Sequence, residues 1–457
     1  MTRLAHDIAA SAWTPLGGDP RALEALELTT DGALASTFAV SDLASAAVGV
    51  AALAVAELAG AHAGRLPNVR VDRRLASFWF GLSLRPLDFR LQPPWDPIAG
   101  DYRARDGWIR LHTNAPHHRA AAQRVLGAHG DRAAMAGAVA QWDTGALEAA
   151  IVAEHGCAAE MRSIAEWSGH AQGIAVAREP LVHQEPTSEG PAALPTGSPA
   201  QPLAGIRVLD LTRVLAGPVA SRFLAGYGAD VLRIDPPDWN EAAIVPETTL
   251  GKRCARLDLK TTAGLAAFES LLRDADVLLH GYRADALERL GFDASARQRL
   301  RPGLVDVCLD AYGWTGAWRN RRGFDSLVQM SSGIAEAGMR WRNAEQPVPL
   351  PVQALDHATG YLIAATAARA LTRRRESGRG TQARLSLART AKLLVDCGAG
   401  HDAPPFEKES ERDRAPEVEV TSWGRAQRLT PPVTIDGAPM RWERPARELG
   451  ADPARWV

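Results

Sequence analysis

The feature that most constrains the fold is a stretch between residues 206 and 310 in which short apolar segments alternate with helical ones. Two parallel strands need a crossover connection, and an α-helix is the usual crossover. The alternation therefore predicts a doubly wound α/β domain with a parallel, Rossmann-like sheet. The strand-like segments are IRVLDL (206–211), ADVLRID (229–235), DVLLH (276–280) and LVDVCLD (304–310), and the helical segments are 215–228, 261–273 and 284–290.

Changes in composition divide the chain into four parts. Residues 183–202 are rich in Pro, Gly, Ser and Thr and contain almost no bulky apolar side chains. We predict a linker there, because such a segment cannot bury enough surface to offset the entropy of ordering. Residues 1–182 form an N-terminal half, 203–394 contain the predicted sheet, and 395–457 are predicted to be a loop and a tail that packs back on a domain.

Two alanine-rich helices indicate an internal repeat. One is predicted to begin at Asp42 and the other at Asp356, and these two aspartates are 314 positions apart. The same offset aligns Arg70 with Arg384, in the short strands predicted to follow the helices. Either a duplication or a shared alanine-rich composition explains the match, and the sequence leaves both open.

The charge balance and the cysteines argue against several classes of function. The net charge is −1, from 52 basic and 53 acidic residues, so we expect neither a nucleic-acid nor an anionic-membrane partner. The four cysteines do not pair at metal-ligand spacing, and we expect no metal site. The longest apolar run, around residues 46–56, is too short to span a bilayer, and the N-terminus lacks a secretory apolar segment, so we expect a cytoplasmic protein.

Two further motifs point away from other sites. The turn after the first predicted strand reads LAGPVA and not G-x-G-x-x-G, which argues against a nicotinamide oxidoreductase. His112, His117 and His118 lie around a predicted strand end and helix start. A metal site there needs a further ligand that the sequence does not place, so we expect these histidines at the surface.

Five segments, in order over about 190 residues, resemble the N-terminal core of the family III CoA-transferases. This family includes formyl-CoA and carnitine CoA-transferases and the α-methylacyl-CoA racemases. The segments are PLAGIRVLDLTRVLAGPVASRFLAGYGADVLRID (202–235), GKRCARLDLKTTAG (251–264), DVLLHGYRADALERLGF (276–292), RGFDSLVQMSSG (322–333) and LDHATGYLIAATAARAL (355–371).

The resemblance implies a Rossmann-like CoA-binding core, a smaller α+β domain and an interlocked homodimer. It also implies a transferase that moves coenzyme A from an acyl-CoA donor to a carboxylic acid acceptor. By family position Asp356 is the nucleophile, which forms a mixed anhydride and then an aspartyl-CoA thioester. A carboxylate can form both species and leave again, and we expect the helix dipole to keep it ionised. The alternative for Asp356 is a simple helix N-cap.

The residues that line the CoA site by family position come from the turns after the predicted strands. Among them, Arg289 and Arg322 are the natural phosphate partners, because a guanidinium offers paired donors to phosphate oxygens. The alternative for both is a solvated surface charge. The full set is Val214, Leu215, Leu257, Lys260, Gly281, Tyr282, Ala286, Arg289 and Arg322.

The chain also departs from the family pattern. Leu215 stands where formyl-CoA transferases often have Gln, Phe324 stands where racemases have His, and the glycine-rich loop of the transferases is absent. Residues 85–182 resemble the family's small domain, which normally follows the core, so the order of domains is duplicated or permuted, and Asp42 is then a vestigial cap. An acyl-CoA racemase or isomerase, or a non-catalytic CoA-binding member, remains an alternative to the transferase.

Overall fold

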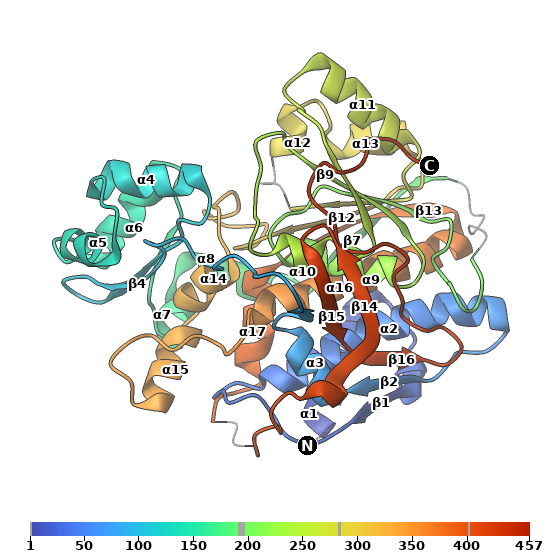
Figure 1. Cartoon of the computed structure of the whole chain (residues 1–457), viewed down its shortest axis with the longest axis horizontal. Coiled ribbons are helices and arrows are strands. Elements are labelled where there is room, and N and C mark those ends of the chain that lie inside the picture. The colour runs from blue at the N-terminus through green and yellow to red at the C-terminus, as the bar shows by residue number, and fades with distance from the viewer. Residues whose placement is uncertain (1, 191–196, 282–284, 401–402) are drawn as a thin grey trace.

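A seven-stranded sheet forms the centre of the chain in a computed structural model that describes residues 2–190, 197–281, 285–400 and 403–457 (Figure 1). Its first six strands are parallel and include the four strands that the alternating pattern predicts, and the seventh is antiparallel. In spatial order the strands are β10 (Lys252–Arg256), β9 (Asp230–Asp235), β8 (Arg207–Asp210), β11 (Val277–His280), β12 (Val305–Asp310), β13 (Arg379–Ser386) and β7 (His183–Glu189).

Successive residues of the strands point into two different cores. Val208 and Val277 face the larger core, whereas their neighbours Leu209 and Leu278 face the smaller one. In Figure 1, α11 covers the smaller core above the sheet, and the helices of the larger core lie below it. The helices around the sheet are α9 (Ala216–Ala225), α10 (Val245–Thr248), α11 (Thr262–Arg273), α12 (Ala286–Arg289), α13 (Ala294–Leu300), α16 (Ala354–Ser377) and α17 (Leu387–Asp396).

The two alanine-rich helices pack against each other in the larger core and have the same length. Helix α2 (Val40–Ala63) and helix α16 begin and end 314 positions apart, and each ends at a glycine with positive φ. Helices α3 (Arg73–Trp79) and α17 begin at the same offset. The register that the sequence match suggests thus extends over two helices and the end of the strand between them, β2 (Val69–Asp72) and β13.

Helix α2 is more extensive than the apolar run at residues 46–56 suggests. By length and composition alone, its segment Val40–Ala61 could cross a membrane, so the sequence-based length argument is wrong for this segment. In the fold, 89% of the apolar stretch of this segment is buried, against α16 and against α1 (Thr2–Trp13) among others. Burial of this kind is what a core helix of a globular protein requires.

A small α+β unit with its own core lies on one side of the sheet domain (Figure 1). It is followed by α7 (Ile164–Gly169) and α8 (Ala171–Arg178), which lead to β7. The unit contacts α14 (Asp325–Ser331). Its elements are β4 (Gly100–Arg103), β5 (Trp108–Leu111), α4 (Pro116–Leu126), α5 (Arg132–Val139), α6 (Thr144–Ala153) and β6 (Ala158–Glu160).

Part of the predicted linker at residues 183–202 is a strand, which corrects that prediction. Strand β7 pairs antiparallel with β13 at the edge of the main sheet. An edge strand is fixed by backbone hydrogen bonds along one side and can carry polar residues, so its composition resembles that of a linker. Residues 191–196 of the predicted linker lie outside the described part of the chain.

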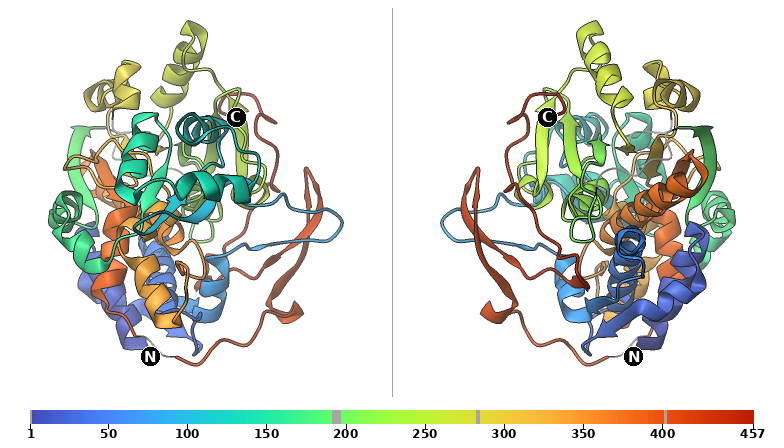
Figure 2. Two further views of the ribbon diagram at one scale, coloured as in Figure 1. Left: turned by 90° about the vertical axis from the view of Figure 1, so that its left-hand side faces the viewer. Right: turned by 90° about the vertical axis from the view of Figure 1, so that its right-hand side faces the viewer.

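The segment after residue 395 is more ordered than the predicted loop and tail. Strand β14 (Arg414–Thr421) pairs with β15 (Gly424–Leu429), and β15 pairs with β3 (Leu84–Pro86); β14 and β15 stand at the outer side of the molecule (Figure 2). Strand β16 (Val433–Ile435) joins β2 and β1 (Leu26–Thr29). The C-terminal segment therefore forms sheets with strands of the N-terminal half. The remaining elements are η1 (Thr14–Leu16), η2 (Pro20–Ala25), α15 (Ile334–Arg342) and η3 (Glu411–Asp413).

Asp42, in the first turn of α2, forms a buried ion pair with Arg73. The two guanidinium Nη atoms each donate to one carboxylate oxygen at 2.8 Å, and Nε donates to the Gly32 carbonyl at 2.8 Å. Asp42 and Arg73 are 7% and 4% exposed. The pair neutralises a carboxylate that would otherwise be buried alone, which is a structural role for Asp42.

We expect Arg73→Ala to lower the free energy of unfolding by about 3–5 kcal/mol, because removing one partner leaves a buried charge uncompensated. Urea denaturation of the full chain measures this change. The double variant Asp42→Ala, Arg73→Ala should recover part of the loss, since it leaves no charge unpaired. A loss below about 1 kcal/mol for Arg73→Ala would mean that Asp42 is solvated and needs no partner.

Candidate functional site

Asp356 lies in the first turn of α16 and is 8% exposed. The carboxylate of Asp325, at the start of α14, holds the beginning of this helix. One Asp325 oxygen accepts the backbone N–H groups of Leu355 at 2.9 Å and Asp356 at 3.0 Å. The other accepts from the side-chain amide of Gln329, whose own oxygen accepts the Leu350 N–H at 2.7 Å. Asp325 therefore caps the helix that carries Asp356, from 31 residues earlier in the chain.

The two carboxyl groups share a poorly solvated environment. Burial raises the pKa of Asp325 to about 6. Burial, and after it the neighbouring Asp325 carboxylate, raise the pKa of Asp356 well above its ordinary value. Burial thus opposes the helix dipole, which we expected to favour the ionised form of Asp356. A dipole contributes about 0.3–1 kcal/mol, whereas full burial can shift a pKa by about 3–5 units.

The turns predicted to hold CoA lie along one edge of the sheet. Val214 and Leu215 follow β8, Leu257 and Lys260 follow β10, and Gly281 follows β11. These three strands are parallel, so all of these turns leave the sheet at its carboxyl edge. Strand order also reverses between β8 and β11, and ligands of open α/β sheets bind at such a switch point. Tyr282 lies outside the described residues.

Val214 has a left-handed backbone, with φ of 64°. This conformation costs about 1–3 kcal/mol for a β-branched residue and persists where the surroundings enforce it. Here the Val214 N–H donates to the Glu241 carboxylate at 2.9 Å. Glu241 also pairs with the buried Arg233, which in turn donates to Asp235 at 2.8 Å. A charged network thus fixes the turn at the switch point.

The remaining predicted CoA residues differ in their exposure and in their contacts with other residues of the protein. Leu257 packs against the smaller core, and Lys260 is exposed. Arg289, in the short helix α12 that begins at Ala286, pairs with Asp285 through a largely exposed side chain, so this pair is weak. Arg322 donates to the His155 carbonyl at 2.8 Å, from the core to the small unit. Their roles toward CoA stay predictions.

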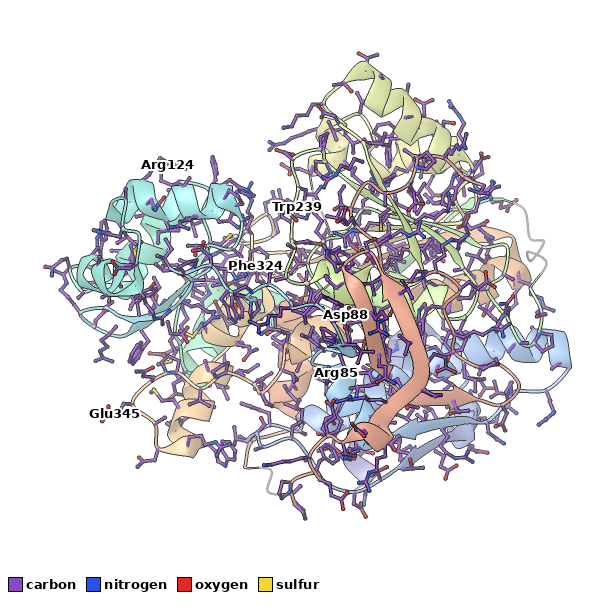
Figure 3. The ribbon with its side chains drawn as sticks, in the orientation of Figure 1. Arg85, Asp88, Arg124, Trp239, Phe324 and Glu345 are labelled. Atoms are coloured by element: carbon purple, nitrogen blue, oxygen red, sulfur yellow. The ribbon has the colours of Figure 1, made fainter. Side chains whose placement is uncertain are left out.

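Two of the three histidines predicted at the surface are buried, which corrects that prediction. His112 and His118 are 6% and 4% exposed, and His117 alone is exposed. Both buried rings contact Phe324, which precedes Asp325 and lies at the junction of the small unit and the core (Figure 3). Their burial comes from packing against a loop some 200 residues away, which local sequence does not reveal. Among the described residues no group of three or more potential metal ligands forms.

Sequence reasoning assigned no role to Asp325 or Glu241. Asp325 lies in the segment RGFDSL that carries part of the family resemblance, and that segment was the available signal. Its contact with Asp356 depends on how α14 packs against the start of α16. Glu241 lies in an irregular segment between β9 and α10 and has no motif around it.

The raised pKa values predict how Asp356 affects stability. A raised folded-state pKa means that the folded chain holds its proton more tightly, so stability is lost as pH rises above the ordinary aspartate pKa. We expect Asp356→Asn to raise the free energy of unfolding at about pH 8, on the order of 1–3 kcal/mol, and to change it less at about pH 4.5. Urea denaturation at both pH values tests this, and a variant less stable than the wild type at the higher pH would contradict it.

The control is Asp42→Asn in the other alanine-rich helix. Asp42 is paired with Arg73, so this variant removes a favourable charge and should destabilise the chain. If the two substitutions change the free energy of unfolding in opposite directions, the charges of the two aspartates are stabilised differently, although they occupy the same position in the two helices.

Comparison with known proteins identifies the core. Residues 203–447 match CoA-transferase family III. The chain is 31% identical over 249 residues to "Acetyl-coenzyme A transferase nodX" of Hypoxylon pulicicidum, covering 49% of this chain and 42% of that one. It is 32% identical over 205 residues to "Succinate--glutarate CoA-transferase" of Agrobacterium fabrum, covering 41% and 51%. The chain thus spans about half the length of the curated relatives it matches.

A solved structure, the "Hypothetical protein (Rv3272) from Mycobacterium tuberculosis", is 30% identical with a TM-score of 0.39, covering 43% of this chain and 58% of that one. The matched family segment spans more than half of the present chain and contains the parallel strands, Asp325 and Asp356. The chain belongs to CoA-transferase family III.

Proposed function

We propose that this protein transfers coenzyme A from an acyl-CoA thioester to a carboxylic acid, with Asp356 as the nucleophile. The observation that carries the proposal is the buried Asp356 carboxyl group, held at a helix start by Asp325, in a chain of this family. The names of the two curated relatives support it, since both are CoA-transferases. The racemase alternative requires a histidine at position 324, where this chain has Phe.

The proposed reaction needs no redox partner and no net proton transfer. The Asp356 carboxylate attacks the thioester carbonyl, the carbon–sulfur bond breaks, and CoA thiolate leaves behind a mixed anhydride. The thiolate then attacks the aspartyl carbonyl, which releases the first acid as a carboxylate and leaves an aspartyl-CoA thioester. The acceptor carboxylate repeats these two steps in reverse, which regenerates Asp356. Covalent catalysis divides a difficult exchange into easier steps.

Asp325 favours these covalent species over the free carboxylate. An ionised Asp356 lies in a buried site near a second carboxyl group, which destabilises it and raises its pKa. In the anhydride and in the thioester, the Asp356 side chain carries no charge, so the repulsion from Asp325 disappears. An interaction that disfavours the ground state more than the following state lowers the barrier between them.

We propose that CoA lies along the carboxyl edge of the sheet. The turn at Val214 and Leu215 lies at the switch point, and Arg289 and Arg322 are the proposed phosphate partners. The other proposed contacts are Leu257, Lys260, Gly281, Tyr282 and Ala286. We further propose that the protein is cytoplasmic and that it forms a homodimer. Sedimentation of the purified chain tests the homodimer.

The first experiment is CoA exchange among short acyl-CoAs and carboxylic acids by the wild type and Asp356→Asn. We expect the variant to lose at least about 10³-fold in kcat/KM, since removal of a covalent nucleophile costs this much or more. CoA binding, measured by calorimetry, should persist. Mass spectrometry of the wild type during turnover should find CoA on the peptide that contains Asp356.

The matched control is Asp42→Asn, which makes the same substitution at the equivalent position of the repeat. We expect it to keep exchange within a few-fold of the wild type once folding is verified, because Asp42 is committed to Arg73. Undiminished exchange by Asp356→Asn would contradict the proposal.

A further inference from the structure

A cavity of about 550 Å³, here called the basic cavity, lies at the carboxyl ends of β12 and β13. Its walls come from the end of α8, the start of β7, the loop after β12 and the end of β13. This size suits a small ligand, since ligand cavities measure about 300–1,000 Å³. The residues that give the cavity its chemistry are Arg178, Glu179, His183, Trp314, Arg384 and Ser386.

The basic cavity is separate from the turns proposed to hold CoA. Those turns follow β8, β10 and β11, whereas the cavity lies at β12, β13 and β7, toward the other end of the sheet. Among the described residues, none of those proposed to contact CoA lines it, and neither does Asp325 or Asp356. Ligands of α/β sheets bind outside the carboxyl ends of the strands, so the position suits a ligand site of its own.

Two guanidinium groups give the cavity a positive charge. Arg178 is the last residue of α8, and Arg384 lies across from His183 in the pairing of β13 with β7. Within the described part of the chain neither arginine has an acidic partner, and the Arg384 guanidinium lies 5.5 Å from the centre of the Trp314 ring. His183 contacts Glu185 at 3.5 Å, but both side chains are exposed, so this contact is weak. An anion that both arginines contact removes the repulsion between them.

The acids near the arginines do not take the place of such an anion. In the lining, Glu179 Oε1 accepts the N–H groups of Trp314 at 2.9 Å and Thr315 at 2.8 Å, and the Thr315 hydroxyl at 2.6 Å. The Glu179 carboxylate is thus occupied in fixing the loop after β12. Asp310 lies opposite Ser386 in the sheet, and burial raises its pKa well above the ordinary value. The uncharged form of Asp310 does not repel an anion.

The donors of the basic cavity suit a phosphate group better than a carboxylate. Arg178, His183 and Arg384 come from three different elements. A phosphate group has three terminal oxygens and a charge of about −1.5 to −2, which matches two guanidinium groups, whereas a carboxylate has two oxygens and one charge. The Ser386 oxygen accepts the Arg389 N–H at 3.2 Å, so its hydroxyl proton is a further donor for the ligand.

We propose that the basic cavity is a second ligand site, which binds the phosphate group of free phosphate or of a small phosphate monoester through Arg178 and Arg384. The site goes beyond the proposed transfer of CoA and does not depend on it. The cavity is larger than a phosphate ion, and the rest of its wall is largely apolar, so a monoester can place a compact organic group there. That wall includes Ala175, Pro180, Trp314 and Leu385.

The test is calorimetric titration of the full chain at constant ionic strength with three probes. Inorganic phosphate and ribose 5-phosphate are the two sources of a phosphate group, and malonate is a dianion without one. The variants are Arg178→Gln and Arg384→Gln. Arg375→Gln is the matched control, since it removes an exposed guanidinium of α16 outside the cavity. Arg289→Gln removes a proposed phosphate partner of CoA. Circular dichroism verifies folding, and the exposed Arg178 can be replaced without disturbing the core.

We expect each cavity variant to weaken phosphate binding at least about 10-fold, because each loses a charge-assisted hydrogen bond. Arg375→Gln and Arg289→Gln should stay within about 2-fold of the wild type, since distant exposed charges are screened. Tighter binding of ribose 5-phosphate than of inorganic phosphate would identify a monoester as the ligand. Equal affinities would identify free phosphate.

The absence of phosphate binding at millimolar concentration would overturn the inference. Malonate binding as tight as that of the phosphates would also overturn it, because the arginines would then accept any dianion. The same holds for an equal loss in Arg375→Gln, which would mean non-specific attraction, and for a loss confined to Arg289→Gln, which would place the phosphate in the CoA site. None of these titrations requires CoA exchange, so a failure of the proposed transferase, which the Asp356→Asn assay detects, leaves this test intact.

Discussion

The arrangement of the site depends on the Asp325 carboxylate, which accepts two backbone N–H groups at the start of α16. Helix starts leave four N–H groups without intrahelical partners, and a buried start must satisfy them from elsewhere. A serine or threonine cap would satisfy them without charge. Here the cap is a buried acid whose pKa rises to about 6, so the cap also controls the charge of its neighbour. The stability of the helix start and the pKa of Asp356 are therefore linked through one side chain.

The two copies of the repeat place an aspartate at the same position but surround it with different charges. Asp42 and Asp356 occupy the same position of two helices that begin and end 314 residues apart. Asp42 is neutralised by Arg73, and the residue at the equivalent offset from Asp356 is Leu387, which has no charge. One copy thus holds a stable ion pair, and the other holds a carboxyl group that is costly to ionise. The second environment fits the proposed nucleophilic role of Asp356, since an ion pair would stabilise the charged ground state.

The parts of the fold that sequence could predict are those with local causes. Four of the parallel strands were predictable because strands buried on both faces are continuous apolar runs. Strand β10 was not, because its sequence, KRCAR, is mostly charged. Strand β7 was not, because an edge strand is held by backbone bonds to β13 and needs no apolar run. The helix that carries Asp356 was predictable from its alanine-rich pattern, which matches that of α2 at an offset of 314 residues. The burial of His112 and His118 does not, because it arises only when the small unit docks on Phe324.

Phe324, which both buried histidines contact, directly precedes Asp325. Among the described residues, no hydrogen-bond partner reaches His112 Nδ1 or either ring nitrogen of His118, and the cap keeps two carboxyl groups in a poorly solvated pair. Both arrangements are unfavourable for the empty protein, and they meet at adjacent residues, Phe324 and Asp325. Formation of the proposed neutral aspartyl adduct would relieve the second, because the Asp356 side chain then carries no charge. Local destabilisation of this kind is found at functional sites because the ligand or the reaction compensates for it.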